Sequence, residues 1–146
     1  GRKSEIIKTS AGRRIALPPI ESTLREIPWV DHALVLGAGR KCLAALITVD
    51  RTALPGSIAE LRTDEPKLRV ELLANINRIA RHEQPAAAIL LRRSFTVDGG
   101  ELTPNLKLRR MEIERKYDFA IESLYAQLDA ISRGSTTEQF LIQMYE

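Results

Sequence analysis

One lysine of this chain occupies a position well suited to phosphate chemistry. Lys107 lies in the segment 101–110, which reads ELTPNLKLRR. Pro104 restricts the backbone just before the lysine. An apolar run precedes the segment and a helical pattern follows it, so we expect Lys107 on a loop between a strand and a helix. A compact ammonium held at one point can meet phosphate oxygens. The alternative is an ordinary solvated lysine.

A second candidate is a small-residue turn near the start of the chain. Ser10, Ala11 and Gly12 follow a short apolar stretch at residues 5–8. Glycine adopts backbone angles that other residues avoid. Gly12 therefore suits either a tight turn or the close approach of a ligand to the backbone.

The lysine segment resembles a known family motif. AMP-forming acyl-CoA synthetases, in particular the long-chain fatty-acid CoA ligases, carry a recurring Leu-Thr-Pro-x-Leu-Lys-hydrophobic-x-Arg signature. The resemblance places Lys107 at the position of the adenylation lysine. Arg110 stands where the family has arginine, and we expect it in a buried or interdomain ion pair. Thr103 would either shape the loop or satisfy its own backbone with its hydroxyl.

The first residues resemble a second motif of the same family, Gly-Arg-x-x-Glu-x-Ile-Lys-x-Ser-Gly-Gly-x-x-Ile, which joins the large domain to the small lid. The resemblance implies that Arg2 lies near the ATP ribose. It also implies a hinge at Lys3, Ser4 and Glu5, although the family commonly has Asp or Lys where this chain has Ser4.

The resemblance gives the turn at residues 10–12 a role as well. In the family, the Ser-Gly-Gly loop lines the pantetheine tunnel when the thioester is made, so Ser10, Ala11 and Gly12 are expected on the CoA side. Ala11 replaces the first glycine. Gly12 is therefore the only position of this turn that keeps the family's glycine, with no side chain to obstruct a ligand.

The composition indicates one globular domain. The 146 residues, 44% of them hydrophobic, can bury a core without disulfides. Cys42 is the only cysteine, which excludes an internal disulfide and favours a reducing, cytoplasmic setting. The sequence shows no signal-peptide pattern and no apolar run of about 20 residues, so neither a signal peptide nor a transmembrane segment is expected. A start at Gly-Arg-Lys rather than Met suggests an excised piece.

The charge pattern gives little support to nucleic-acid binding. The net charge is +3 and only 5% of the residues are aromatic, whereas nucleic-acid surfaces usually combine clustered cations with stacking aromatics. The arginine pairs at 13–14, 92–93 and 109–110 are expected on the solvated surface, with contact to nucleotide or CoA phosphates as the alternative.

His32 and His82 lack neighbours at metal-ligand spacing, so no metal site is expected.

The apolar spacing predicts an α+β fold with a small mixed or antiparallel sheet and packed helices. Strands are expected at residues 5–8, 15–17, 29–36, 41–49 and 88–97, and the third and fourth should pair antiparallel across a glycine-rich turn at 37–40. Three helices are expected. The first begins at Pro18, and the second is capped by Thr63 or Asp64 and has Leu68, Leu72, Ile76 and Ile79 on one face. The third is a single helix with one apolar side, formed by Ile113, Tyr117, Ile121, Leu124 and Leu128. Trp29 should be a core residue and Cys42 a small buried one.

The sequence thus predicts a lid domain at residues 1–131 and a tail at 132–146 to which no role is assigned. The resemblance implies a two-step reaction in the full-length protein: fatty acid and ATP, with Mg²⁺, give acyl-AMP and pyrophosphate, and CoA then displaces AMP to give acyl-CoA. The implied partner is an N-terminal adenylation domain that binds most of the ATP, CoA and Mg²⁺. The alternatives are the lid of a fatty-acyl-AMP ligase that serves a carrier protein, and a non-catalytic docking module.

Overall fold

A four-stranded sheet forms the centre of the computed structural model, which describes residues 5–134 and 140–146. Its strands lie in the order β3 (Val30–Leu36), β4 (Ala44–Val49), β5 (Ala87–Leu91) and β6 (Leu141–Tyr145). β3 and β4 are antiparallel, whereas β4, β5 and β6 are parallel. A separate antiparallel hairpin is made by β1 (Ile6–Lys8) and β2 (Arg14–Ala16).

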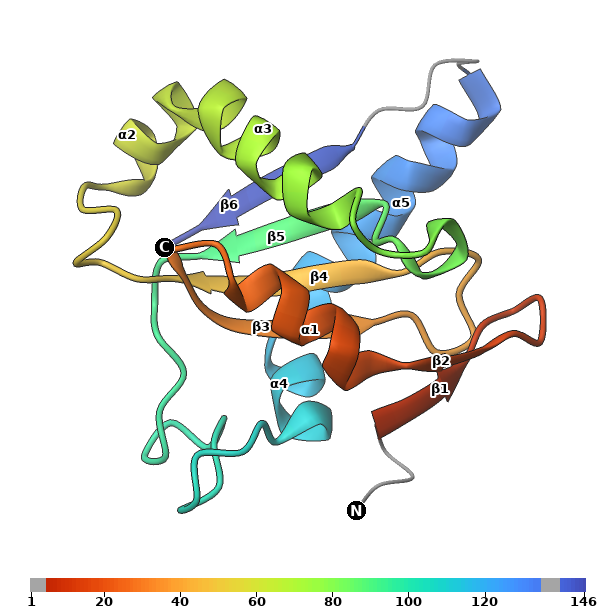
Figure 1. The fold of residues 1–146 in the computed structure, drawn as a ribbon, viewed down its shortest axis with the longest axis horizontal. Coiled ribbons are helices and arrows are strands. Elements are labelled where there is room, and N and C mark those ends of the chain that lie inside the picture. Colours follow the sequence, from red (N-terminus) through yellow and green to blue (C-terminus); the bar gives the residue numbers. More distant parts are fainter. Residues whose placement is uncertain (1–4, 135–139) are drawn as a thin grey trace.

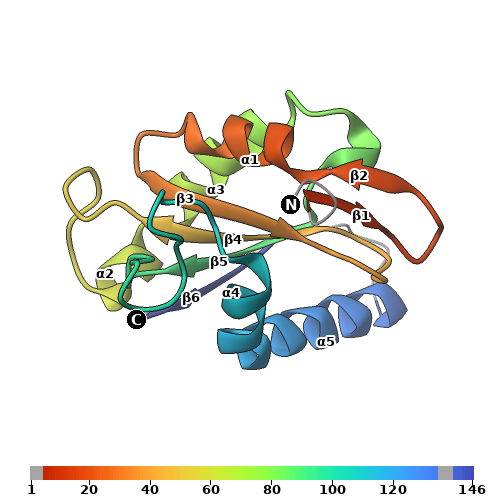
Figure 2. The same ribbon diagram turned by 90° about the horizontal axis from the view of Figure 1, so that it is seen from below.

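Helices cover both faces of the central sheet, as Figures 1 and 2 show. One face carries α1 (Leu17–Arg25), α2 (Ile58–Thr63) and α3 (Glu65–Ile76), and the other carries α4 (Arg110–Lys116) and α5 (Asp118–Gly134). Mixed strands with packed helices confirm the predicted α+β class. None of the helices in the described part of the chain is long and apolar enough to cross a membrane.

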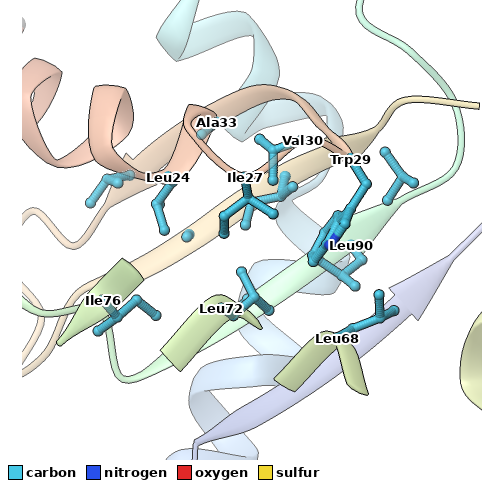
Figure 3. Packing of buried hydrophobic residues seen from close by; sticks show 14 of the residues in the cluster. Leu24, Ile27, Trp29, Val30, Ala33, Leu68, Leu72, Ile76 and Leu90 are labelled. Atoms are coloured by element: carbon cyan, nitrogen blue, oxygen red, sulfur yellow. The ribbon is translucent and has the colours of Figure 1, made fainter. Parts of the chain in front are cut away.

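The two faces explain why β4 and β5 read as continuous apolar runs. Alternate residues of a strand point to opposite faces, so Ile47 enters the core under α1 and α3 while Leu46 enters the core over α4 and α5. Figure 3 shows the first core, where Leu24, Leu72 and Leu90 meet between helices and sheet.

Trp29 is 4% exposed, which confirms its predicted position in the core. Its indole Nε1 donates a hydrogen bond to Glu71 Oε2 at 2.9 Å. Cys42 is only partly buried, contrary to expectation, and burial raises the pKa of its thiol.

Two predicted elements were too long. The strand expected at 88–97 ends at Leu91, after which the chain leaves the sheet and Phe95 returns to the second core. The single helix expected through Ile113 and Leu128 is two helices, because the chain turns at Tyr117 (φ −106°, ψ 20°). The apolar side chains still share one core because the turn keeps them on the same face of the sheet.

The third helix and the tail also differ from expectation. Asp64 precedes α3 but makes no side-chain cap hydrogen bond, and Ile79 lies beyond the end of the helix at Ile76. The tail at 132–146, to which the sequence analysis assigned no element, supplies β6, which pairs with β5 from Ala87↔Leu141 to Leu91↔Tyr145.

Candidate functional site

The lysine lies on a small hairpin, residues 102–108, which we call the lysine hairpin. Leu102 and Leu108 form an antiparallel bridge at its base. Thr103 then organises the tip: its N–H donates to Lys107 O at 2.8 Å, and its Oγ1 accepts from the Lys107 N–H at 3.0 Å. Leu106 has φ +64°, a left-handed conformation uncommon for a branched side chain. The fold thus presents Lys107 as an exposed cation on a turn that its own backbone holds closed.

A buried ion pair fixes the C-terminal end of this hairpin. Arg110, the first residue of α4, donates from Nη1 to Glu21 Oε2 at 2.7 Å and from Nη2 to Glu21 Oε1 at 2.6 Å. The Glu21 carboxylate also accepts from the Val35 N–H at 2.8 Å. Burial, the largest single cause, lowers the pKa of Arg110, but the hydrogen bond to Glu21 and the nearby carboxylate charges together raise it above its usual value. The contact therefore joins α4 to α1 and β3 and confirms the predicted buried ion pair.

A second buried carboxylate fixes the N-terminal end. Glu101 is 2% exposed, its Oε1 accepts from the Thr96 N–H at 2.9 Å, and its Oε2 accepts from Lys116 Nζ at 2.6 Å. Its carbonyl oxygen accepts from the Arg109 N–H at 2.8 Å. Burial, the largest single cause, raises the pKa of Glu101, but the hydrogen bonds from Lys116 and Thr96 and the nearby positive charges together hold it below its usual value. No local sequence pattern points to Glu101, because its contacts come from residues up to fifteen positions away.

The glycine turn lies on the β1–β2 hairpin, which we call the glycine hairpin (residues 6–16). The Gly12 N–H donates a hydrogen bond to Thr9 O at 2.9 Å and closes the turn. Gly12 has a φ of +83°. A Cβ at Gly12 would meet no atom within 4 Å. Ser10, Ala11 and Gly12 are all exposed, so the turn presents backbone to its surroundings rather than to the core.

The glycine hairpin is attached to the turn that joins β3 and β4. The Ser10 N–H donates to Arg40 O and the Gly39 N–H donates to Lys8 O, both at 2.9 Å. Gly39 has φ +71° and lies in the loop between two antiparallel strands, which confirms the expected hairpin turn.

The structure places the two hairpins at opposite ends of the molecule rather than in one site. Figures 1 and 2 show the β1–β2 hairpin projecting at one end, while the loop between β5 and α4 lies at the other. Lys107 and Gly12 therefore cannot both contact one small bound group in a single orientation of this domain.

Of the residues predicted to contact the ribose or to form the hinge, the structure describes only Glu5. Arg2, Lys3 and Ser4 lie outside the described residues. Glu5 is described and partly buried, and its charge contributes to the raised pKa of Arg110. Glu5 therefore lies near Arg110, at the start of α4.

The arginine pairs are not uniformly solvated. Arg13, Arg14, Arg93 and Arg109 are exposed, as expected. Arg92, which directly follows β5, is 3% exposed, and burial and then the nearby Arg51 lower its pKa. The expectation of a solvated surface was wrong for Arg92 and also for Arg110, whose side chain is 11% exposed in its pair with Glu21.

The described residues contain no preformed cluster of metal-ligand side chains. Across residues 5–134 and 140–146, no group of three His, Cys, Asp or Glu residues could hold a metal ion. Mg²⁺ usually binds through one or two carboxylates together with substrate phosphates and water, so an ion that accompanies ATP does not need such a cluster.

The comparisons with known proteins establish the class. The model of the AMP-binding enzyme C-terminal domain family matches residues 4–129, so this chain belongs to that family. The resemblance inferred from the two motifs is thereby confirmed.

Relatives with assigned activities extend the comparison. The chain is 34% identical over 140 residues to the long-chain-fatty-acid–CoA ligase FadD15 of Mycobacterium tuberculosis. The alignment covers 86% of this chain and 23% of that protein. It is 28% identical over 158 residues to human long-chain-fatty-acid–CoA ligase ACSBG1, covering 87% of this chain and 22% of that protein. The chain thus spans less than a quarter of the length of these relatives.

A solved structure supports the fold. The adenylation domain of a carboxylate reductase from Mycobacterium chelonae matches with a TM-score of 0.75 and 25% identity, over 86% of this chain and 20% of that one.

Proposed function

We propose that this chain is the mobile C-terminal lid of an ATP-dependent, AMP-forming long-chain fatty-acid CoA ligase. The single observation that carries the proposal is Lys107 itself: an exposed cation presented on a hairpin whose two ends are anchored by buried carboxylates. The names of two relatives, both long-chain-fatty-acid–CoA ligases, agree with it.

Lys107 would act when the fatty-acid carboxylate attacks the α-phosphorus of ATP. Negative charge gathers on the phosphate oxygens in that step, and a preorganised cation stabilises it. At about 4 Å and an effective dielectric constant near 20, the attraction is about 4 kcal/mol. A contact of that size changes the rate by orders of magnitude.

Gly12 would act in the second step. An exposed turn of small residues lets the pantetheine arm of CoA pass close to the backbone, which a larger side chain would obstruct. Ser10 and Ala11 would line the same path, and Arg2 would lie near the ATP ribose.

The separation of the two hairpins then requires the lid to turn between half-reactions. Each hairpin would face the active site of the preceding domain in one step only. The pivot would be Lys3, Ser4 and Glu5, next to the start of β1, and a hinge of this kind needs a few residues that can change their backbone angles.

The test is a pair of half-reaction assays on the full-length protein. Fatty-acid-dependent ATP–pyrophosphate exchange measures adenylation, and CoA consumption with supplied acyl-AMP measures thioester formation. Both activities are expected. Adenylation without CoA consumption, but with transfer to a carrier protein, would identify a fatty-acyl-AMP ligase. No adenylation with any fatty acid would identify a docking module.

A calorimetric measurement on this chain alone complements the assays. Most nucleotide contacts would belong to the preceding domain, so ATP should bind weakly to the lid. A dissociation constant of about 1 μM, equivalent to about −8 kcal/mol, would contradict this division of labour.

A further inference from the structure

We propose that Glu101 is a positioning residue that sets where Lys107 stands relative to the rest of the lid. The inference rests on the proposed function, since it concerns the same lysine. Glu101 lies six residues before Lys107, at the entrance to the lysine hairpin, and does not contact the lysine through any hydrogen bond or ion pair that the structure records.

The first support is that Glu101 joins three segments at one point. Its carboxylate receives the Thr96 N–H from the preceding turn and the Lys116 ammonium from the end of α4. Its main-chain oxygen receives the Arg109 N–H from the far side of the hairpin. A displacement of Glu101 therefore moves both ends of the hairpin relative to α4.

The second support is the packing around the carboxylate. The backbone of Gly99 passes so close that a Cβ there would collide with Glu101 Oε1, and it would lie 2.8 Å from Thr96 Oγ1. Thr96 Oγ1 in turn accepts from the Gly99 N–H at 2.8 Å. The turn at residues 96–99 is thus built around the carboxylate, which leaves Glu101 little freedom to shift.

The third support is energetic. A buried carboxylate is costly unless it is paired and hydrogen-bonded, and both oxygens of Glu101 are occupied. Lys116 keeps a side-chain exposure of 38%, so it could reach water without Glu101. Stability alone does not require a charge here, since an apolar replacement is often equally stable. The directional bonds instead specify one arrangement of the hairpin.

Glu101 also acts separately from the other buried pair. Arg110 and Glu21 fix the start of α4 to α1 and β3, whereas Glu101 fixes the hairpin to the end of α4. Loss of Glu101 therefore leaves α4 docked while the hairpin loses its fixed orientation. Displacements of about 1 Å can slow a reaction by about a hundredfold.

The experiment compares half-reactions in the full-length protein. Glu101→Gln keeps the shape of the side chain but removes its charge. We expect kcat for adenylation to fall by about ten- to a hundredfold, with the KM for ATP and the rate of CoA transfer from supplied acyl-AMP changed by less than about threefold. Lys116→Gln should act in the same way, and Lys116→Arg should restore most of the rate.

The matched control is Glu26→Gln. Glu26 also pairs with a cation, Arg78, at 2.7 Å, but on the exposed surface of the opposite helical layer. It should leave both half-reactions unchanged. Lys107→Ala, measured alongside, reports on the proposed function itself.

The outcomes separate the two claims. If Lys107→Ala leaves adenylation intact, the proposed function fails. If Lys107→Ala slows adenylation but Glu101→Gln and Lys116→Gln behave like Glu26→Gln, the positioning role is wrong and the function stands. Equal loss of both half-reactions in the Glu101 and Lys116 variants would show that the pair maintains the fold, which also overturns the proposal. Should Glu101→Gln not fold, Lys116→Gln and Lys116→Arg decide by the same criteria.

Discussion

The lysine hairpin and the glycine hairpin are both short antiparallel turns at the surface, but the domain holds them in different ways. The lysine hairpin is anchored at each end by a buried carboxylate, Glu101 or Glu21, that binds a cation from α4. The glycine hairpin is attached by backbone hydrogen bonds to the β3–β4 turn, and its tip is exposed.

This difference matches the two proposed tasks. A point charge must be held in place to stabilise a transition state, which charged, directional bonds achieve. A passage for a flexible thiol arm requires mainly the absence of a side chain, which an exposed glycine provides.

The buried anchor of the lysine hairpin should matter most for stability. Arg110→Met leaves the Glu21 carboxylate buried without its cation, which should lower the free energy of unfolding by about 3–5 kcal/mol. Urea denaturation of this chain measures it. Arg78→Met, which breaks an exposed pair with Glu26, is the control and should have little effect. Similar values for the two variants would mean that burial does not distinguish the anchor.

The lysine itself should matter for one half-reaction only. Lys107→Ala in the full-length protein should slow adenylation by about a hundredfold or more, by analogy with the loss of one preorganised electrostatic contact. It should spare CoA transfer from supplied acyl-AMP and leave stability unchanged, because the side chain is exposed. Lys67→Ala, an exposed lysine of α3, is the control. Equal damage to both half-reactions would assign Lys107 a structural role.

Rotation about the hinge should bring each of the two hairpins in turn to the same active site. Ser4→Pro fixes φ near −65° at the proposed pivot, so one half-reaction should stay near normal while the other falls by about tenfold or more. Adenylation is the expected survivor. The two half-reactions are measured separately on folded protein. Wild-type rates for both would place the pivot elsewhere.

The glycine hairpin should affect the opposite half-reaction. Gly12→Leu should slow thioester formation by about tenfold by obstructing the thiol path, and spare adenylation. The strain of a side chain at φ +83° costs only about 1 kcal/mol. Gly100→Leu is a matched control, because Gly100 has the same φ and the same open surroundings at the other end of the molecule. If Gly100→Leu slows CoA transfer as much as Gly12→Leu does, strain alone explains the loss.

The smallest expected effect is a pH dependence at Glu101. Its pKa in the folded chain lies below the usual 4.5, so the ionised carboxylate stabilises the fold above that pH and this contribution is lost as the pH falls through the lowered pKa. The stability difference between wild type and Glu101→Gln, measured by urea denaturation, should be largest above pH 4.5 and shrink below it. A constant difference across the range would show that the carboxylate charge contributes nothing.

The sequence alone determined the features that depend on neighbouring residues. Apolar runs on either side of the Gly37–Gly39 turn predicted the β3–β4 hairpin, and the motif around Lys107 placed the lysine between a strand and a helix. Buried faces at Leu68, Leu72 and Ile76 followed from helical spacing. Such patterns persist because local backbone geometry sets which residues share a face.

Only the tertiary structure decided how distant segments combine. The tail becomes β6 because β5 offers it a free edge, and the turn at Tyr117 divides α4 from α5 so that both fit one core. The pairs Glu21–Arg110 and Glu101–Lys116 join residues 89 and 15 positions apart. Burial alone makes these charges strong constraints, and burial is a property of the packed fold rather than of any short sequence pattern.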